Sequence, residues 1–186
     1  MVAGPSGVGK GTVLSELRRR YPSLLYSVSA TTRQPRPGEV DGIAYHFVSD
    51  QQFDDLIASG GLLEWAQYTG VRYGTPRQPV LDALADGRTV LLEINLDGAR
   101  QVRASFPQAM QVFIAPPSWD ELRRRLRDRG AETEEQMAAR LATAQSELAA
   151  EGEFDHVIVN DNLSRAVDDL VELLGLAKGT NSDHGD

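Results

Sequence analysis

Cysteine is absent from this chain of 186 residues, so disulfide bonds, thiolate metal sites and thiol nucleophiles are all excluded. Histidine is scarce as well, and none of the three histidines has an evident partner for a proton relay. No apolar run approaches the roughly 20 residues that span a bilayer, and the first residues lack the pattern of a signal peptide. These absences favour a cytoplasmic protein that does not rely on histidine or cysteine catalysis.

An excess of basic charge is also missing, because 27 acidic residues outnumber 19 basic ones and the net charge is −8. A nucleic-acid backbone or an anionic membrane would be repelled overall, so we expect neither as a partner. Any affinity for phosphate must therefore come from arginines that gather locally. Hydrophobic residues make up 41% of the chain, which is enough for one domain with a core and small inserted subdomains.

A glycine-rich loop at residues 4–12 is the most informative feature that is present. It fits the pattern G-x-x-x-x-G-K, in which glycines let backbone N–H groups turn toward a polyphosphate and lysine reaches the outer phosphates. Gly11 stands where the pattern has serine or threonine, and the hydroxyl comes one position later. The residues expected at this phosphate site are Gly4, Pro5, Ser6, Gly7, Val8, Gly9, Lys10, Gly11 and Thr12.

Short apolar runs alternate with longer helical patterns through most of the chain. This alternation predicts an α/β fold in which helices cover both faces of a parallel sheet. Capping boxes are predicted at Ser118 and Thr133. The predicted strands are residues 25–29, 90–94, 110–114 and 156–159, and the predicted helices are 10–21, 98–106, 118–129, 133–150 and 163–174.

Residues 33–86 interrupt this rhythm and predict a small mixed α+β subdomain inserted into the core. Its expected elements are strands at 45–48, 62–68 and 71–73 and a helix at 50–59. The core is then formed by 1–32 and 87–174, and 175–186 is expected to be a disordered tail. Only three residues precede Gly4, so we expect the natural chain to begin upstream of Met1.

A proline-stiffened loop in this segment carries Arg33 and Arg36, and each guanidinium can bind a phosphate through two hydrogen bonds. Tyr45 and Tyr73 lie near turns and can add hydroxyl donors. The alternative for such a pair of arginines is a solvated loop with no ligand. The arginine loop lies close in sequence to the glycine-rich loop, and this position favours a phosphate-binding site over a solvated loop.

Several ordered motifs together resemble guanylate kinase over nearly the whole chain. They are residues 4–12, 27–39, 41–47, 63–66 (Leu-Glu-Trp-Ala), 73–75 (Tyr-Gly-Thr), 114–118 (Ile-Ala-Pro-Pro-Ser), 129–133 (Arg-Gly-Ala-Glu-Thr) and 157–161 (Val-Ile-Val-Asn-Asp). The resemblance implies a P-loop fold with a GMP-binding subdomain at 33–86 and a helical lid at about 120–145. It implies transfer of the γ-phosphoryl group of ATP to GMP, and to dGMP, giving ADP and GDP.

The resemblance also assigns roles to residues. Glu64 would read guanine through N1–H and the 2-amino group, two donors that adenine does not present in that arrangement. The alternative for Glu64 is a surface carboxylate on a strand. The implied GMP site is Ser29, Arg33, Arg36, Tyr45, Glu64, Tyr73, Thr75, Glu93 and Asn95. The family more often has aspartates where this chain has Glu93 and Asn95.

On the donor side, the resemblance adds Arg125, Arg129 and Asn160 to the phosphate loop as ATP-binding residues. The implied catalytic residues are Lys10, Arg33, Arg125, Arg129 and Arg140. No general base is expected, because the accepting phosphate is already largely ionised at pH 7. Mg²⁺ is expected with ATP, and because Gly11 lacks a hydroxyl, Thr12 is only a weak candidate ligand.

Two alternatives remain open from the sequence. One is another nucleoside monophosphate kinase that prefers AMP or a deoxynucleotide. The other is a non-catalytic guanylate kinase-like module that binds phosphopeptides, although a scaffold has no need of Lys10. The expected partners are ATP and GMP, and a homo-oligomer is possible.

Overall fold

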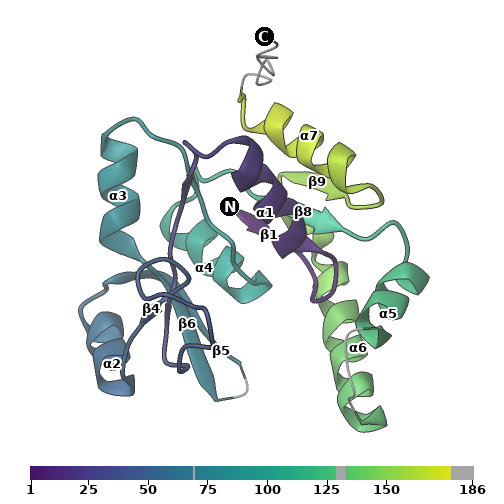
Figure 1. Cartoon of the computed structure of the whole chain (residues 1–186), viewed down its shortest axis with the longest axis horizontal. Helices are drawn as coiled ribbons and strands as arrows, with labels where there is room; N and C mark the ends of the chain where they lie inside the picture. The colour runs from purple at the N-terminus through teal and green to yellow at the C-terminus, as the bar shows by residue number, and fades with distance from the viewer. Residues whose placement is uncertain (69, 129–132, 177–186) are drawn as a thin grey trace. The chain divides into compact units, whose positions relative to one another are not determined.

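The computed structural model describes residues 1–68, 70–128 and 133–176, and it divides the chain into two compact units. The first unit consists of Met1–Ala3 and Leu24–Gln111, and the second of Gly4–Ser23 and Val112–Asp186. Figure 1 labels most of the helices and strands along the chain. None of the helices within the described ranges is long and apolar enough to cross a membrane.

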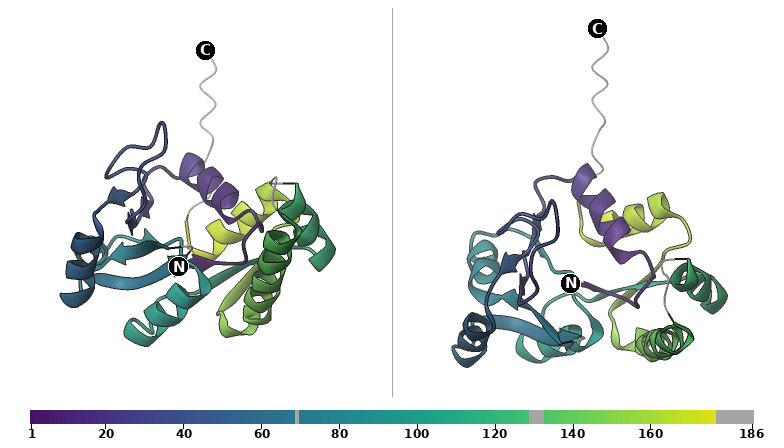
Figure 2. Two further views of the ribbon diagram at one scale, coloured as in Figure 1. Left: turned by 90° about the horizontal axis from the view of Figure 1, so that it is seen from below. Right: turned by 60° about the horizontal axis from the view of Figure 1, so that its bottom comes forward.

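The first unit contains a mixed sheet of four strands in the order β4-β3-β6-β5. Strands β5 and β6 pair antiparallel and form the long two-stranded ribbon visible in Figures 1 and 2. The elements of this unit are β1 (Val2–Ala3), β2 (Leu25–Tyr26), β3 (Ala30–Thr31), β4 (His46–Phe47), α2 (Asp50–Ala58), β5 (Leu62–Tyr68), β6 (Val71–Pro76), α3 (Arg77–Ala85), β7 (Val90–Leu91) and α4 (Leu96–Ser105).

Helix α2 covers this sheet through Phe53, which is fully buried and packs with Ala30 and Leu62. The helix begins at a complete capping box, in which Ser49 accepts from the Gln52 backbone and the Gln52 side chain accepts from Ser49 N. Both bonds satisfy amides that a helix start leaves open. Helix α4 packs against β5, and β2 pairs parallel with β7.

In the second unit, β8 and β9 pair parallel from Val112↔His156 to Ala115↔Val159. The burial of Val13, Leu17 and Leu170 reflects the packing of α1 on α7, and α5 packs on α6. The elements are α1 (Lys10–Arg20), β8 (Val112–Ala115), α5 (Trp119–Arg127), α6 (Glu134–Ala149), η1 (Glu151–Glu153), β9 (His156–Val159) and α7 (Leu163–Leu173).

The predicted α/β class is confirmed, since helices alternate with strands that pair in parallel. The predicted box at Thr133 is complete, but Ser118 forms only half of one, because the Glu121 carboxylate bonds to arginines instead. Helix α3 was not predicted from the sequence. It begins without a side-chain cap, so no start signal marks it. Ten of the twelve residues of the predicted tail lie outside the described residues.

Candidate functional site

The glycine-rich loop leads into α1 in the second unit, and three of its glycines (Gly4, Gly7 and Gly9) have backbone conformations that other residues rarely adopt. Gly7 has φ +84° and Gly9 has φ +91°. A Cβ on Gly9 would stand 2.7 Å from Asn160 Nδ2, and one on Gly7 would stand 2.7 Å from Leu126 Cδ2. Glycine is therefore required at both positions by conformation and by the close neighbours.

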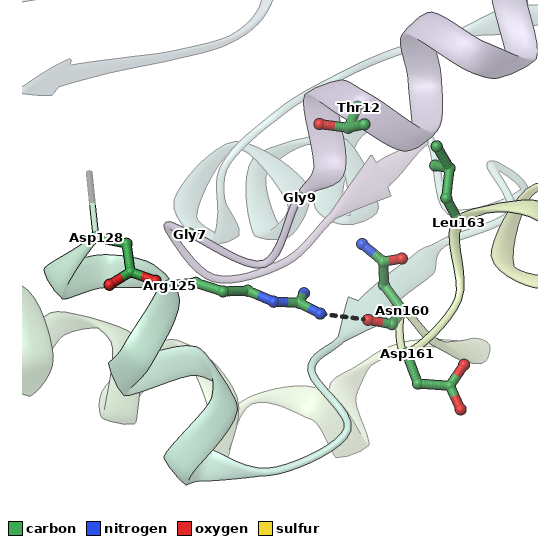
Figure 3. A pocket seen from close by; sticks show the side chains of 8 residues that line it. All are labelled: Gly7, Gly9, Thr12, Arg125, Asp128, Asn160, Asp161 and Leu163. Atoms are coloured by element: carbon green, nitrogen blue, oxygen red, sulfur yellow. Dashed lines mark hydrogen bonds between the residues drawn. The ribbon is translucent and has the colours of Figure 1, made fainter.

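Arg125 on α5 and Asn160 after β9 hold this loop from outside. Arg125 Nη1 donates to Val8 O at 3.0 Å and Nη2 to Asn160 O at 3.1 Å, and Figure 3 shows the guanidinium extended toward Asn160. Asn160 is buried, and its Nδ2 donates to the same Val8 oxygen at 2.8 Å. The structure thus brings together three residues that lie far apart in the sequence.

Glu121 orients Arg125 by accepting from its Nε at 2.8 Å. Arg124, together with Arg125, lowers the pKa of Glu121 to about 2. Glu121 was not predicted as a site residue. Its position in the first turn of α5, four residues before Arg125, is the sequence signal that points to the pair.

A cavity of about 410 Å³ opens beside the loop. This volume lies within the range of small-molecule sites. The walls of the cavity carry a cation, two carboxylates and backbone amides. They can therefore contact phosphate groups as well as a polar ring. The lining residues are Gly7, Gly9, Thr12, Arg125, Asp128, Asn160, Asp161 and Leu163.

The other residues that the sequence predicts for the ATP site also belong to the second unit. Lys10 begins α1 and Arg140 lies on α6, whereas Arg129 lies outside the described residues. Glu147, also on α6, accepts from Ser6 N at 3.0 Å and so connects the loop to a helix that begins within the predicted lid and ends just after it. Glu147 was not predicted, because no local pattern marks a carboxylate that bonds a backbone amide 141 residues away.

The first unit holds the second cluster of predicted residues. Arg33 forms a bidentate ion pair with Glu39, in which Nη1 lies 2.8 Å from Oε2 and Nη2 lies 2.9 Å from Oε1. Arg36 joins through its backbone N, which donates to Glu39 Oε2 at 2.7 Å. Arg33 lowers the pKa of Glu39 to about 2, and Glu39 raises the pKa of Arg33.

Aromatic rings surround the Arg33 guanidinium. Its Cζ lies 5.2 Å from the centre of the Tyr45 ring and 5.7 Å from that of Phe47, and the rings of Tyr45 and Tyr73 are 6.0 Å apart. Burial, with Tyr73 and Glu93 nearby, raises the pKa of Tyr45. The Arg33 side chain is therefore held on several sides, and phosphate binding by Arg33 and Arg36 stays a prediction.

Glu64 lies on β5 and is 6% exposed, so it is not a surface carboxylate. Strand register places it opposite Thr75, whose Oγ1 donates to Glu64 Oε1 at 2.6 Å. Burial raises the pKa of Glu64, and the hydrogen bonds from Thr75 oppose that shift in part. A buried carboxylate whose donors both come from Thr75 retains acceptor capacity for a ligand.

The last predicted residues of this cluster lie at strand and helix ends. Asn95 caps α4, because its Oδ1 accepts from Gly98 N at 2.8 Å. Glu93 is exposed and lies two positions before this cap, and Ser29 immediately precedes β3. The capping bond gives Asn95 a structural role that the sequence prediction did not include.

Comparison with known proteins gives consistent matches. A family model described as guanylate kinase matches residues 1–176. A guanylate kinase from Thermobifida fusca (strain YX) is 59% identical over 174 residues, which are 94% of this chain and 89% of that protein.

Solved structures also match this chain, at lower sequence identity. A guanylate kinase from Anaplasma phagocytophilum matches with a TM-score of 0.74 at 31% identity, covering 97% of this chain and 85% of that one. A shikimate kinase from Bacteroides thetaiotaomicron matches with a TM-score of 0.50 at 17% identity, covering 94% and 96%, and bears on the fold alone. The predicted P-loop type of fold is confirmed by these neighbours.

Proposed function

This chain belongs to the guanylate kinase family, and we propose that it phosphorylates GMP with ATP through the two residue clusters of its two units. In the reaction the bond between the β–γ bridging oxygen and the γ-phosphorus of ATP breaks. A phosphate oxygen of GMP forms the new bond, and ADP and GDP leave. The general role of this reaction is the recycling of GMP into the guanine nucleotide pool.

The buried Glu64 carboxylate is the observation that carries the substrate assignment. With Oε1 bonded to Thr75, the carboxylate can still accept from two adjacent donors, and guanine presents N1–H and the 2-amino group side by side. Adenine presents an unprotonated N1 and no 2-amino group. AMP would leave a buried carboxylate without its partners, and a mismatch of this kind costs several orders of magnitude in kcat/KM.

The cluster around Arg33 supplies the phosphate end of the same site. Its guanidinium is preoriented by Glu39 and by the rings of Tyr45 and Phe47. We expect the GMP phosphate to bind to Arg33 and Arg36 with hydroxyl donors from Tyr45 and Tyr73. The proposed lining of the GMP site is completed by Ser29, Glu93 and Asn95. Asn95 would contact GMP and cap α4 at the same time.

The cavity beside the glycine-rich loop is the proposed ATP site. Loop amides and Lys10 would bind the phosphates, and we expect the purine ring to bind near Arg125 and Asn160, which line the cavity. Arg129 and Arg140 are proposed to neutralise charge on the transferring group. Because the accepting oxygen is already ionised, these residues need only position the substrates and stabilise charge.

Mg²⁺ is proposed to arrive with ATP, where it neutralises phosphate charge. Among the described residues, no three His, Asp or Glu side chains gather into a metal site. Thr12 lines the ATP cavity, together with Asp128 and Asp161. This sparse donor set fits a hydrated Mg²⁺ that is held mainly by phosphates and water.

Lys10→Ala tests catalysis against the alternative of a binding module. We expect kcat to fall about 100-fold or more, because the lysine cation that neutralises the transferring phosphates is lost. The affinity for GMP should stay within about twofold. ADP release coupled to a spectroscopic assay measures the rate, and calorimetry measures GMP binding. Arg88→Ala, which removes an exposed cation outside both clusters, is the control. A Lys10→Ala protein with normal turnover would refute the assignment.

A further inference from the structure

Helix α4 carries a glycine where it approaches Glu64. A Cβ built on Gly98 would overlap Glu64 Oε2 and would stand 3.0 Å from Glu64 Cδ and 3.1 Å from Asn95 Oδ1. Gly98 has no unusual backbone conformation, since it is not among the glycines with positive φ. Glycine is normally disfavoured in a helix, so the reason for it here is the space that the carboxylate occupies.

One turn further along α4, Gln101 fastens the helix to β5. Its Nε2 donates to Trp65 O at 2.8 Å, and its Oε1 accepts from Trp65 N at 3.0 Å. Strand β5 lies at the edge of its sheet, so this amide satisfies backbone groups that an edge strand leaves open. The two bonds fix α4 along the strand at the residue that follows Glu64.

The Glu64 carboxylate is therefore held from two sides. Oε1 accepts from Thr75 Oγ1 on β6, and Oε2 faces the bare Cα of Gly98. We infer that Gly98 and Gln101 are specificity-determining positioning residues, which fix the Glu64 carboxylate so that it meets the paired donors of a 2-amino-6-oxopurine. This inference rests on the proposed role of Glu64 as the base reader.

Gly98→Ala separates this role from a role in folding. The atoms nearest to the new methyl group are the end of the Glu64 side chain and the Asn95 cap. The Glu64 carboxylate can swing away, so we expect the variant to fold with its base reader displaced. A displacement of about 1 Å in a positioning group costs roughly tenfold to a hundredfold in rate.

The experiment measures KM and kcat for GMP, IMP and ATP in wild type, Gly98→Ala and Gln101→Leu. IMP keeps N1–H but lacks the 2-amino group. We expect Gly98→Ala to raise the KM for GMP about tenfold or more and to reduce the preference for GMP over IMP, with the KM for ATP within about twofold. Gln101→Leu is expected to shift the same quantities by a smaller factor. Gly152→Ala, with nothing within 4 Å of its new methyl group, is the silent control.

A Glu64→Ala background shows whether Gly98 acts through Glu64. There the methyl group meets no carboxylate, so Gly98→Ala should leave GMP affinity unchanged and should raise the Tm above that of Glu64→Ala alone, because alanine favours a helix more than glycine does. An unchanged KM for GMP and an unchanged GMP:IMP ratio in Gly98→Ala would overturn the inference. So would an equal loss of affinity in the Glu64→Ala background. Wild-type protein that fails to phosphorylate GMP would count instead against the proposed function.

Discussion

Glu64 illustrates at the scale of one residue how selectivity for a ligand can oppose stability. The side chain is buried on β5 with Thr75 as its hydrogen-bond donor, and burial raises its pKa. A raised pKa in the folded state means that this group stabilises the fold at low pH and that the contribution is lost as the pH rises through the folded pKa. Ionisation of the buried carboxylate therefore lowers the stability of the empty site.

Glu64→Gln tests this opposition. We expect kcat/KM for GMP to fall about 100-fold or more, because the amide offers one acceptor and presents a donor to another donor. Stability at pH 7 should be equal to that of wild type or higher, because the buried charge is gone. Steady-state kinetics and thermal unfolding measure the two effects. A variant that keeps its GMP activity, or one that is clearly less stable, would contradict this assignment.

The KM for GMP should also depend on pH through Glu64. As the pH falls, protonation of Glu64 removes an acceptor, and because its pKa is raised this loss begins at a higher pH than for an ordinary glutamate. The GMP phosphate titrates near pH 6 and contributes its own change. The Glu64→Gln variant retains only the phosphate part, so the difference between the two profiles reports Glu64. Identical profiles would argue against a role for its ionised form.

At the scale of elements, the sequence predicted what local signals determine. The capping box at Thr133 and the apolar periodicity of α1 and α7 marked helices that the structure contains. Helix α3 has no side-chain cap and carried no such signal. The Gln101 clamp on Trp65 joins residues 36 positions apart, and such approaches depend on tertiary packing that a local pattern does not encode.

The candidate site divides in the same way. The glycine-rich loop and the Arg33 loop were recognisable from residue types and spacing. Two of their partners were not, since Glu39 and Glu147 resemble ordinary surface acids in the sequence. Their contacts with Arg33 and Ser6 appear only in the folded chain, whereas the spacing of four residues between Glu121 and Arg125 marks their pair in the sequence.

Gly9→Ala probes the turn between the loop and α1. The left-handed backbone of Gly9 and the nearby Asn160 amide both oppose a methyl group. We expect a loss of stability of about 1–2 kcal/mol from the backbone and a rise in the KM for ATP of about tenfold or more, because the loop must shift from its binding geometry. Chemical denaturation and kinetics measure both effects.

Gly87→Ala is the matched control for this turn. Gly87 has φ +71° and nothing within 4 Å of its new methyl group, so the variant carries the backbone strain alone. It should lose a similar amount of stability and keep the KM for ATP. If both variants show the same KM for ATP, the contact with Asn160 has no part in ATP binding.

At the scale of the whole molecule, we expect ion pairs in both units to contribute to the response to acid. Arginines lower the pKa of Glu16, Glu39 and Glu121 from 4.5 to about 2. A lowered pKa contributes stability above pH 4.5, and this contribution disappears as the pH falls toward 2. We therefore expect the Tm to decrease over that interval. Addition of 0.5 M salt should reduce the decrease, because salt screens exposed ion pairs.

Thermal unfolding between pH 7 and pH 2 measures this response, and Glu39→Gln should reduce the decrease by removing one of the three pairs. A Tm that stays constant down to pH 2 would show that these pairs do not contribute. Glu64 acts in the opposite sense and at higher pH, because its pKa is raised above 4.5 and its protonation stabilises the fold, so Glu64→Gln should make the total decrease between pH 7 and pH 2 larger.

Selection of GMP by the buried Glu64 carboxylate is central to the proposed function. The ratio of kcat/KM for GMP to that for AMP measures this selection directly. ADP release from the wild-type protein with GMP, dGMP, AMP, UMP and CMP gives this ratio together with the rest of the preference. We expect GMP to exceed AMP by about 10⁴ or more, because AMP leaves Glu64 unpaired. Equal rates with GMP and AMP would show that Glu64 does not read the base.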